Sequence, residues 1–473
     1  MQNIDTFYIG GEWLAPAPGA GTHAIVDPST EQAIGQVAMG TAQDVDRAVS
    51  AARAAFTEWS QTTREDRLVL LNRLAEIYQR RLPEMAAAIT LEMGAPTWLA
   101  TQYQAGIGLV QIRQAIAALR DFEFEGTAGK TRVLREPIGV AALITAWNWP
   151  ADLVWGKVAA ALAAGCTMVL KPSELAALDA RLAAEILHEA GVPAGVFNML
   201  FGDGKVVGAA LSRHPEVDMV SITGSTRAGA EVAMDAAPTI KRVVQELGGK
   251  SASVILDDAE LKGAVSATVI NCMLNSGQTC VAPTRMLVPR SLYPAAVTVA
   301  TTTANGLLVG PPRDPGSKLG PLASRAQFER VQTLIACGSE EGARVVAGGT
   351  GRPEGLEQGF YVRPTVFAGV RNDMRIAREE IFGPVIAVIP YEDEEDAIAI
   401  ANDSAYGLAA YVWSGDVERA RRVARRLRVG SVRINGAPMD FAAPFGGYKA
   451  SGNGREHGAH GLAEYLETKS LIG

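Results

Sequence analysis

One carboxylate and one thiol in this chain could together carry out covalent catalysis on a carbonyl group. Glu246 opens the segment 246–250 (ELGGK), and Cys280 ends the segment 277–280 (GQTC). A thiolate can add to a carbonyl carbon and hold the acyl group as a thioester, and a carboxylate can then activate the water that releases it. A lone cysteine is more often a small buried hydrophobic residue, so the thiol gains meaning only from its surroundings.

Further motifs accompany these two segments along the chain. They are FYIGGEW (7–13), WNWP (147–150), KPSE (171–174), TGST (223–226), EIFGP (380–384), PFGGYK (444–449) and SGNGRE (451–456). Their types and order resemble the NAD(P)-dependent aldehyde dehydrogenase superfamily nearly end to end. The carboxylate at Glu246 matches the hydrolytic members, since relatives that pass the acyl group to coenzyme A lack it.

This resemblance implies oxidation of an aldehyde to the carboxylic acid, with NAD as hydride acceptor and NADP as an alternative. It implies that Cys280 forms a thiohemiacetal and then a thioester, and that Glu246 activates the hydrolytic water. Asn148 and the backbone N–H of Cys280 would stabilise the alkoxide. Lys157 matches a lysine often placed in the proton-relay region of the family.

Bland interpretations of the same residues remain open. On local grounds Asn148 is a turn residue, and Lys157 could equally be a solvated helix lysine. Two other functions also remain: a coenzyme A-acylating enzyme, and a binding or structural protein that keeps the fold without turnover. Intact Cys280, Glu246 and Asn148 argue against the last.

The resemblance also assigns cofactor contacts. Lys171 and Glu174 would bind the adenosine ribose, although both could simply begin a helix capped by Ser173. No orthodox GxGxxG fingerprint is present, and 202–208 resembles a degenerate form of it. A carboxylate at Glu174 disfavours a 2′-phosphate, which favours NAD. The remaining predicted contacts are Ser225 at the pyrophosphate, Glu380 at the nicotinamide ribose, Phe382 beside the nicotinamide ring, and Gly224, Gly204, Trp147 and Leu247.

A largely apolar substrate channel is expected near the thiol. Its predicted lining is Trp149, Leu153, Leu274, Thr279, Val281 and Phe441. This favours medium-chain aliphatic or aromatic aldehydes. Segments 149–152 and 436–443 resemble a bacterial subgroup that includes enzymes for long ω-oxo acids and a pyridine semialdehyde.

Other side chains offer no competing chemistry. His23 and His214 are interpreted as surface residues, and His457 and His460 follow a glycine-rich tail, so neither a Ser-His pair nor a metal site is predicted. The cysteines at 166, 272, 280 and 337 have no CxxC spacing, and their low number fits a reducing cytoplasm. A net charge of -7 argues against a nucleic-acid partner. Apolar runs interrupted by charges indicate neither a signal peptide nor a membrane span.

Periodicity predicts an α/β fold of the aldehyde dehydrogenase type. Helical spacing begins after Thr41, continues through 64–82, and restarts at Pro83. Five short apolar runs then alternate with helices 152–164 and 176–190, which is typical of a parallel sheet. These strand candidates are 140–146, 167–170, 196–200, 219–223 and 252–256.

A chain of 473 residues needs more than one core. We expect a Rossmann-type NAD-binding domain from 1–117 and 138–248, and a second α/β domain with the thiol from 249–450. Residues 118–137 and 451–473 would form a small β bridging arm and tail. By resemblance this arm pairs with another subunit, giving a homodimer or homotetramer.

Overall fold

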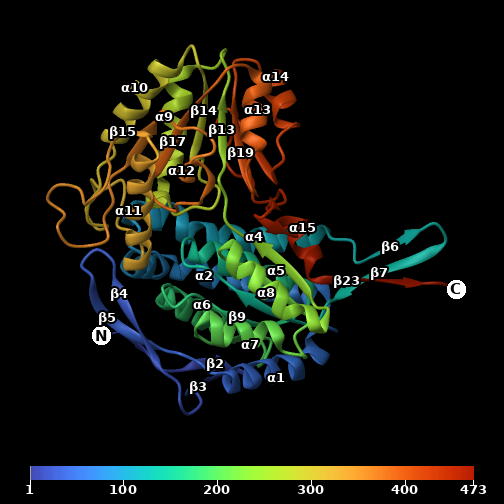
Figure 1. The fold of residues 1–473 in the computed structure, drawn as a ribbon. Helices are drawn as coiled ribbons and strands as arrows, with labels where there is room; N and C mark the ends of the chain where they lie inside the picture. The colour runs from blue at the N-terminus through green and yellow to red at the C-terminus, as the bar shows by residue number, and fades with distance from the viewer. Residues whose placement is uncertain (1) are drawn as a thin grey trace.

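The computed structural model describes residues 2–473, which fold around two large, mainly parallel β-sheets (Figure 1). One sheet of eight strands and one of seven strands lie in separate bodies, and a thin β arm projects from the eight-stranded body. The α/β fold class expected from the sequence is confirmed. Within the described residues, no helix is both long and apolar enough to cross a membrane.

The eight-stranded sheet has the order β22-β12-β11-β8-β9-β10-β2-β3. Its five central strands are parallel, while β22, β2 and β3 add antiparallel edges. The strands are β2 (Phe7–Ile9), β3 (Glu12–Leu14), β8 (Val140–Ile144), β9 (Thr167–Lys171), β10 (Phe197–Met199), β11 (Met219–Thr223), β12 (Arg242–Glu246) and β22 (Gly452–Asn453).

Helices cover both faces of this sheet. Helices α5 and α6 lie on one face with α2 and α4 packed behind them, and α1, α7 and α8 lie on the other. Their bounds are α1 (Ala42–Trp59), α2 (Arg64–Met93), α4 (Ala105–Asp121), α5 (Pro150–Ala164), α6 (Ala177–Glu189), α7 (Ala209–Arg213) and α8 (Thr226–Ala236), and shorter turns are α3 (Thr97–Leu99), η1 (Ala100–Gln104), η2 (Gly204–Gly208) and η3 (Ala237–Thr239). Helix α1 begins after Thr41, as the helical spacing predicted, and Thr41 and Asp44 form a capping box at its start.

The order of these strands creates a ligand-binding crevice. The chain runs outward from β8 through β9 to β10, and then returns to place β11 on the opposite side of β8. Open parallel sheets bind ligands at the carboxyl ends of the strands where the direction reverses. The segments that follow β8 and β11 are Trp147–Trp149 and Gly224–Thr226, so both predicted motifs lie at this point.

The seven-stranded sheet has the order β15-β16-β17-β14-β13-β19-β20, and only β15 is antiparallel to its neighbour. Helices α9 and α10 share one apolar core beside it, and α11, α13 and α14 share another. The elements are β13 (Ala252–Ile255), α9 (Leu261–Met273), η4 (Leu274–Gly277), β14 (Arg285–Pro289), α10 (Tyr293–Asn305), α11 (Arg325–Glu340), β15 (Arg344–Ala347), β16 (Thr365–Ala368), α12 (Arg375–Arg378), β17 (Val385–Tyr391), α13 (Glu394–Asn402), β19 (Ala409–Trp413), α14 (Val417–Ala424) and β20 (Ser431–Ile434).

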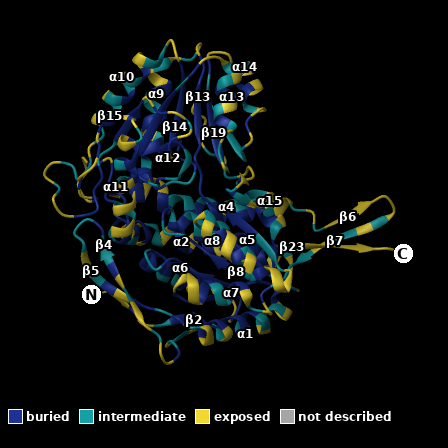
Figure 2. Ribbon diagram, viewed as in Figure 1, coloured by how far each residue is buried: buried dark blue, intermediate teal, exposed yellow. Residues whose placement is uncertain are grey.

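The projecting arm consists of β6 (Glu125–Ala128), β7 (Thr131–Pro137) and β23 (Leu466–Leu471). Strand β7 lies in the middle, paired antiparallel with both neighbours. Figure 2 shows that this arm is mostly exposed, whereas the strands of both large sheets are buried. The segment 118–137, for which a β arm was expected, thus contributes two of its strands.

The small pairings join distant parts of the chain. They are β1 (Gln2–Ile4) and β4 (Thr22–Asp27) with β5 (Gln32–Ala38), and β18 (Tyr406–Gly407) with β21 (Tyr448–Lys449). Helix α15 (Gly458–Glu464) packs against α4 and α5. The predicted domain boundaries remain a proposal; segment 451–473 contributes strands to both the eight-stranded sheet and the arm.

The structure corrects three element predictions. Pro83 does not begin a new helix, because α2 runs unbroken from Arg64 to Met93 with Pro83 inside it. Strand β13 belongs to the seven-stranded sheet and not to the series that begins at β8. Strand β12, which ends at Glu246, has no counterpart among the five predicted strands.

Candidate active site

The thiol lies on a tightly wound loop after α9. Asn275, Ser276 and Gly277 all adopt positive φ angles, of 56°, 54° and 75°. Such values are uncommon for residues other than glycine and persist only where the surroundings hold them. Among the four cysteines, Cys280 alone is not fully buried. The loop therefore offers the one thiol that a substrate could reach.

Side-chain amides fix this loop to the eight-stranded body. Asn275 Nδ2 donates to the carbonyl of Asn148 at 2.8 Å, and its Oδ1 accepts from Gln104 at 2.9 Å. Asn148 Nδ2 in turn donates to the carbonyl of Gln278 at 3.1 Å. The amide of Asn148 thus points at the loop that ends in Cys280. Asn275, which the sequence did not single out, is the residue that joins the two.

The backbone N–H of Cys280 makes no hydrogen bond to the described residues. It is therefore free to donate to an oxygen that develops charge beside the thiol. Burial raises the pKa of the Cys280 thiol, and the carboxylates of Glu246 and Glu380 add to the rise. The thiol consequently needs a base to remove its proton.

Glu246 supplies a carboxylate in the same site. It ends β12, and its carbonyl accepts from Gly224 N–H at 3.0 Å, which places it beside the turn after β11. It is only 3% exposed, and neither carboxylate oxygen has a hydrogen-bond partner among the described residues. Burial raises its pKa well above the ordinary value, and Glu456 raises it further. A buried carboxylate without donors is a strong base once ionised.

Lys157 is paired rather than solvated. Its Nζ contacts Glu456 Oε1 in an ion pair and donates to Ser221 Oγ at 3.0 Å, and the lysine is 1% exposed. Glu456 lies in the quoted SGNGRE motif but received no role from the sequence. The pair lies close enough to Glu246 to act on the pKa of its carboxyl.

Several predicted cofactor residues meet along the carboxyl edge of the eight-stranded sheet. Lys171 Nζ lies 3.7 Å from Glu174 just past β9. Ser225 caps α8, its Oγ accepting from Ala228 N–H at 3.2 Å. The first N–H groups of a helix have no acceptor within it, so this end of α8 suits a pyrophosphate.

A second group of predicted cofactor residues faces this edge from the other body. Glu380 Oε1 accepts from Gly249 N–H at 2.9 Å. Phe382, with φ of 59°, packs edge-on against Trp147 with ring centroids 5.5 Å apart. The two groups thus lie at the sheet edge where open parallel sheets bind dinucleotides.

Two predicted cofactor residues lie less directly in the site. Leu247 is buried and packs on Gly229, where a Cβ would come within 2.6 Å of it. Gly204 begins η2, and a Cβ there would meet no atom, so space alone does not demand glycine. By contrast, a Cβ at Gly202 would clash with Val207.

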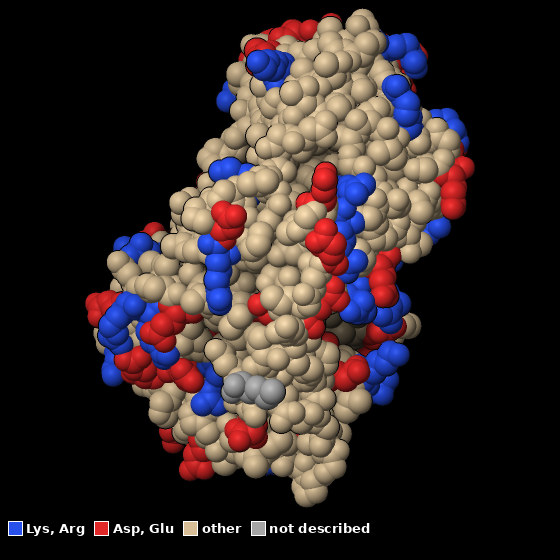
Figure 3. All heavy atoms as spheres, turned by 90° about the vertical axis from the view of Figure 1, so that its left-hand side faces the viewer, with Lys and Arg blue, Asp and Glu red and all other residues tan. Residues whose placement is uncertain are grey.

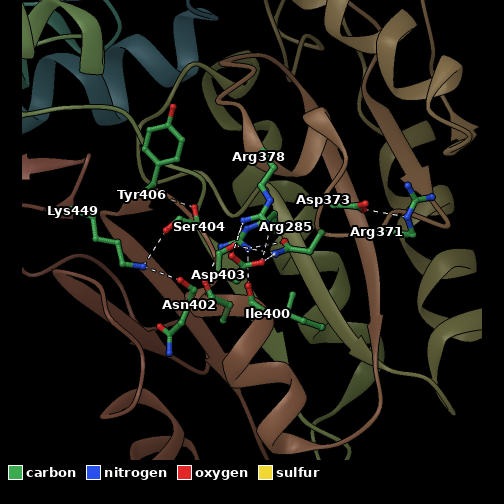
Figure 4. Close-up of polar contacts among 12 residues, drawn as sticks. Arg285, Arg371, Asp373, Arg378, Ile400, Asn402, Asp403, Ser404, Tyr406 and Lys449 are labelled. Carbon is green, nitrogen blue, oxygen red and sulfur yellow. Dashed lines mark hydrogen bonds and ion pairs between the residues drawn. The ribbon is translucent and has the colours of Figure 1, made fainter.

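The segment that carries Glu246 is held by the seven-stranded body. Ser451 Oγ donates to the carbonyl of Gly248 at 2.7 Å and accepts from Gly407 N–H at 3.0 Å. The turn before Gly407 is itself pinned, as Figure 4 shows: Arg378 binds Asp403, and Lys449 donates to the carbonyls of Asn402 and Ser404. Arg285, 2% exposed, donates to the carbonyls of Ile400 and Ala401 at the end of α13.

The predicted channel residues surround the thiol unevenly. Trp149 Nε1 donates to Thr279 Oγ1 at 3.0 Å, so these two lie beside the thiol loop. Val281 packs with Cys280 and Phe445. Leu274 packs against the core of the eight-stranded body, while Leu153 is half-buried on α5. Phe441 lies with its ring 5.4 Å from that of His457.

His457 is more than part of a glycine-rich tail. It is 7% exposed, with its ring stacked on Phe445 at 5.0 Å. Its Nε2 lies 2.8 Å from Gln111 Nε2, and the same amide nitrogen donates to Asp152 Oδ1 at 2.6 Å. The sequence could not reveal this cluster because its members come from three distant segments.

Charges on the outer surface are mixed. On the face in Figure 3, basic and acidic side chains lie intermixed among broad uncharged areas. Ion pairs such as Arg325–Glu31 balance individual charges. This distribution differs from the single-sign surface with which proteins bind nucleic acid.

Comparison with known proteins identifies the family. The sequence model of the aldehyde dehydrogenase family matches residues 13–471. The chain is 54% identical to a 3-succinoylsemialdehyde-pyridine dehydrogenase from Pseudomonas sp, over 100% of this chain and 99% of that one. A putative aldehyde dehydrogenase from Staphylococcus saprophyticus is 45% identical over the same shares.

Solved structures of aldehyde dehydrogenases are also closely similar to this chain. Aldehyde dehydrogenase C from Pseudomonas syringae, a cysteine-to-alanine mutant in complex with NAD+ and octanal, superposes with a TM-score of 0.98 at 52% identity, covering 99% of this chain and 96% of that one. An NAD+ complex of an aldehyde dehydrogenase from Mycobacterium tuberculosis gives 0.97 at 42% identity, covering 99% and 98%. These similarities agree with a site that brings together a thiol, a buried carboxylate and a sheet edge suited to a dinucleotide. This chain belongs to the aldehyde dehydrogenase family and oxidises aldehydes with NAD.

Proposed function

We propose that Cys280 is the nucleophile and Glu246 the base of a hydrolytic aldehyde oxidation. The observation that carries this is the meeting of the one accessible thiol with a buried carboxylate whose oxygens have no partner. Glu246 takes the thiol proton, and the thiolate adds to the aldehyde carbon while the carbonyl electron pair moves to oxygen. Asn148 and the Cys280 N–H donate to that oxygen.

NAD, when bound, supplies the acceptor for the hydride that leaves the carbon, and a thioester on Cys280 results. Glu246 then removes a proton from water, the hydroxyl adds to the thioester carbon, and the thiol leaves with the acid released. Lys157, paired with Glu456, is proposed as part of the path by which Glu246 passes its proton onward.

Lys171, Glu174, Gly224, Ser225 and Gly204 are proposed for the adenosine and pyrophosphate side of the cofactor. Trp147, Leu247, Glu380 and Phe382 are proposed for the nicotinamide side. The Glu174 carboxylate beside Lys171 supports a preference for NAD over NADP, because a 2′-phosphate would meet negative charge there.

We propose medium-chain aliphatic or aromatic aldehydes as substrates. Partly buried Trp149, Leu153 and Phe441 support an apolar entrance. The names of two relatives point the same way: one is a 3-succinoylsemialdehyde-pyridine dehydrogenase, and one was crystallised with octanal.

We also propose a homodimer or homotetramer assembled through the arm. Strands β6, β7 and β23 project from the body with free outer edges, and Leu471 and Ile472 at its end are 44% and 87% exposed. Apolar residues on an exposed strand favour pairing with another chain. A cytoplasmic location is proposed because all four cysteines are free.

The test is NADH formation by the purified protein, with NAD or NADP and a panel from acetaldehyde to decanal, benzaldehyde and semialdehyde acids. We expect turnover of medium-chain or aromatic aldehydes with NAD, unaltered by coenzyme A. Acceleration by coenzyme A would replace the hydrolytic assignment with acyl transfer. Absence of turnover across the panel, with NAD bound, would contradict the proposed substrate class.

A further inference from the structure

One face of α5 is open although the rest of the helix is buried. Of its residues, only Asp152, Leu153 and Gly156 are not buried. Their spacing places them on one side of the helix, the side that begins with Trp149. A Cβ at Gly156 would meet only the side chain of Gln111 on α4, at 3.5 Å. The face begins beside Trp149, whose indole donates to Thr279 Oγ1 next to the thiol, and it contains a carboxylate.

Asp152 is held by a neighbour on α4. Gln111 Nε2 donates to Asp152 Oδ1 at 2.6 Å, and Oδ2 makes no hydrogen bond to the residues that the structure describes. A carboxylate only accepts, so the nitrogen of the Gln111 amide must face it. The same nitrogen lies 2.8 Å from His457 Nε2. One carboxylate oxygen is thus fixed and the other is left for a ligand.

The cluster is linked to the surroundings of the reacting thiol. His457 stacks on Phe445 with centroids 5.0 Å apart, and Phe445 and Cys280 pack against the same apolar residues, Val281, Leu408 and Ala409. Asp152 also raises the pKa of the Cys280 thiol. Through Gln111 and His457, the Asp152 carboxylate thus belongs to a cluster of side chains that reaches the apolar surroundings of Cys280.

Among residues 2–473, no cation forms an ion pair with Asp152. The nearby Lys157 is already paired with Glu456. His457 Nε2 accepts from the Gln111 amide, so this nitrogen carries no proton, and burial lowers the pKa of the ring. Burial raises the pKa of Asp152, and His457 and the Gln111 hydrogen bond oppose that rise. A cation placed next to Oδ2 would stabilise the ionised carboxylate, since an ion pair gains most where water is excluded.

We propose that Asp152, fixed by Gln111 and His457, is a charge-selective subsite that favours aldehydes with a remote ammonium group and rejects those with a remote carboxylate. This inference rests on the proposed function, because it assumes that the aldehyde group lies at Cys280. Neutral aliphatic aldehydes pass the subsite without penalty along Leu153 and Trp149.

The test compares kcat/KM for octanal and its ω-amino and ω-carboxylate counterparts, the amine released from its acetal immediately before use. In the wild-type enzyme we expect the amine to exceed the carboxylate by at least about tenfold, the size of a modest charge interaction. In Asp152→Asn, the ratio of kcat/KM for the amine to that for the carboxylate should fall toward one. The control is Asp121→Asn on α4, whose exposed carboxylate lies outside the channel, and which should leave the ratio unchanged.

The possible results distinguish the proposed subsite from the proposed dehydrogenase function. Octanal turnover with no difference between amine and carboxylate, or with the carboxylate preferred, would overturn the subsite and leave the dehydrogenase assignment intact. A ratio unchanged in Asp152→Asn would also overturn it, reducing Asp152 to a structural tie between α4 and α5. Loss of turnover for all three substrates in the wild type would instead remove the proposed substrate class. Should Asp152→Asn fail to fold, the wild-type ratio alone decides.

Discussion

Two buried carboxylates a short distance apart are treated differently by this fold. Glu456 is bound by Lys157, which also donates to Ser221, so every charge there has a partner. Glu246 is as deeply buried but has no donor on either oxygen among the described residues. Leaving a buried acid unpaired costs free energy, whereas pairing it stabilises the arrangement only when the geometry is good.

The difference between Glu456 and Glu246 distinguishes a carboxylate that stabilises the structure from one that can react. The paired acid, Glu456, holds its neighbours in place, while the unpaired acid, Glu246, has a raised pKa and is ready to exchange a proton. The thiol shows the same contrast, because the N–H of Cys280 is free while the residues before it are held by Asn275. Rigid, satisfied contacts thus surround a small set of unsatisfied groups.

The largest effect should come from removing the unpaired thiol. Cys280→Ala should lower steady-state NADH formation by on the order of 10⁶-fold, as loss of a nucleophile does in other covalent enzymes. The matched control is Cys272→Ala, which deletes a buried thiol near the end of α9, the helix that precedes the Cys280 loop, and should keep the wild-type rate. Comparable activity in the two variants would show that Cys280 is not the nucleophile.

Glu246→Gln should slow hydrolysis of the thioester more than it slows hydride transfer. We expect steady-state turnover to fall by about 10³-fold, the usual range for loss of a general base. A rapid burst of NADH near one equivalent per site should still appear, because hydride transfer precedes hydrolysis. Stopped-flow absorbance measures both phases, and a full steady-state rate would remove Glu246 from the mechanism.

Breaking the paired acid should affect stability. Lys157→Met strands Glu456 as a buried charge, and we expect the free energy of unfolding to fall by about 3 kcal/mol. The double variant Lys157→Met/Glu456→Gln should recover most of that loss, because no uncompensated charge remains. Equilibrium denaturation gives all three values. An additive double variant would mean that the pair contributes nothing as a unit.

The smallest effect is a shift in pH dependence. Because the pKa of Glu246 is raised, its carboxyl holds a proton at the lower pH and releases it as pH rises, so wild-type kcat should increase through that pKa. The Lys157 charge lowers this pKa. In Lys157→Met the rising limb should therefore move to higher pH, and a move in the other direction would refute the coupling.

The local sequence pattern predicted those strands correctly that are buried on both faces of the sheet. Strands β8, β9 and β11 were predicted within two residues, because both faces are covered by helices and the sequence is continuously apolar. Strand β12 was not predicted from the sequence because its residues are Arg, Val, Val, Gln and Glu. It forms a strand because it pairs with β11 and β22. The break at Pro83 was wrong because tertiary packing keeps α2 continuous across a proline.

Site residues divide in the same way. Glu246, Cys280 and Asn148 stand in recognisable motifs, so the sequence alone could single them out. His457, Gln111 and Asp152 are assembled from α4, α5 and the turn before α15, and their chemistry exists only in contact. Asn275 is likewise defined by what it touches.

Strand β22 has a consequence for how the enzyme comes into being. It covers the outer edge of β12, pairing Gly452 with Glu246, and Glu456 reaches Lys157 across an interval of 299 residues. During synthesis from the N-terminus, the strand with the proposed base keeps an open edge until residues near 452 leave the ribosome. A partly synthesised chain could therefore already contain the sheet edge proposed for the cofactor and the Cys280 thiol, while the strand that carries Glu246 is still unpaired on one side. Catalytic activity would then begin only when synthesis of the chain is nearly complete.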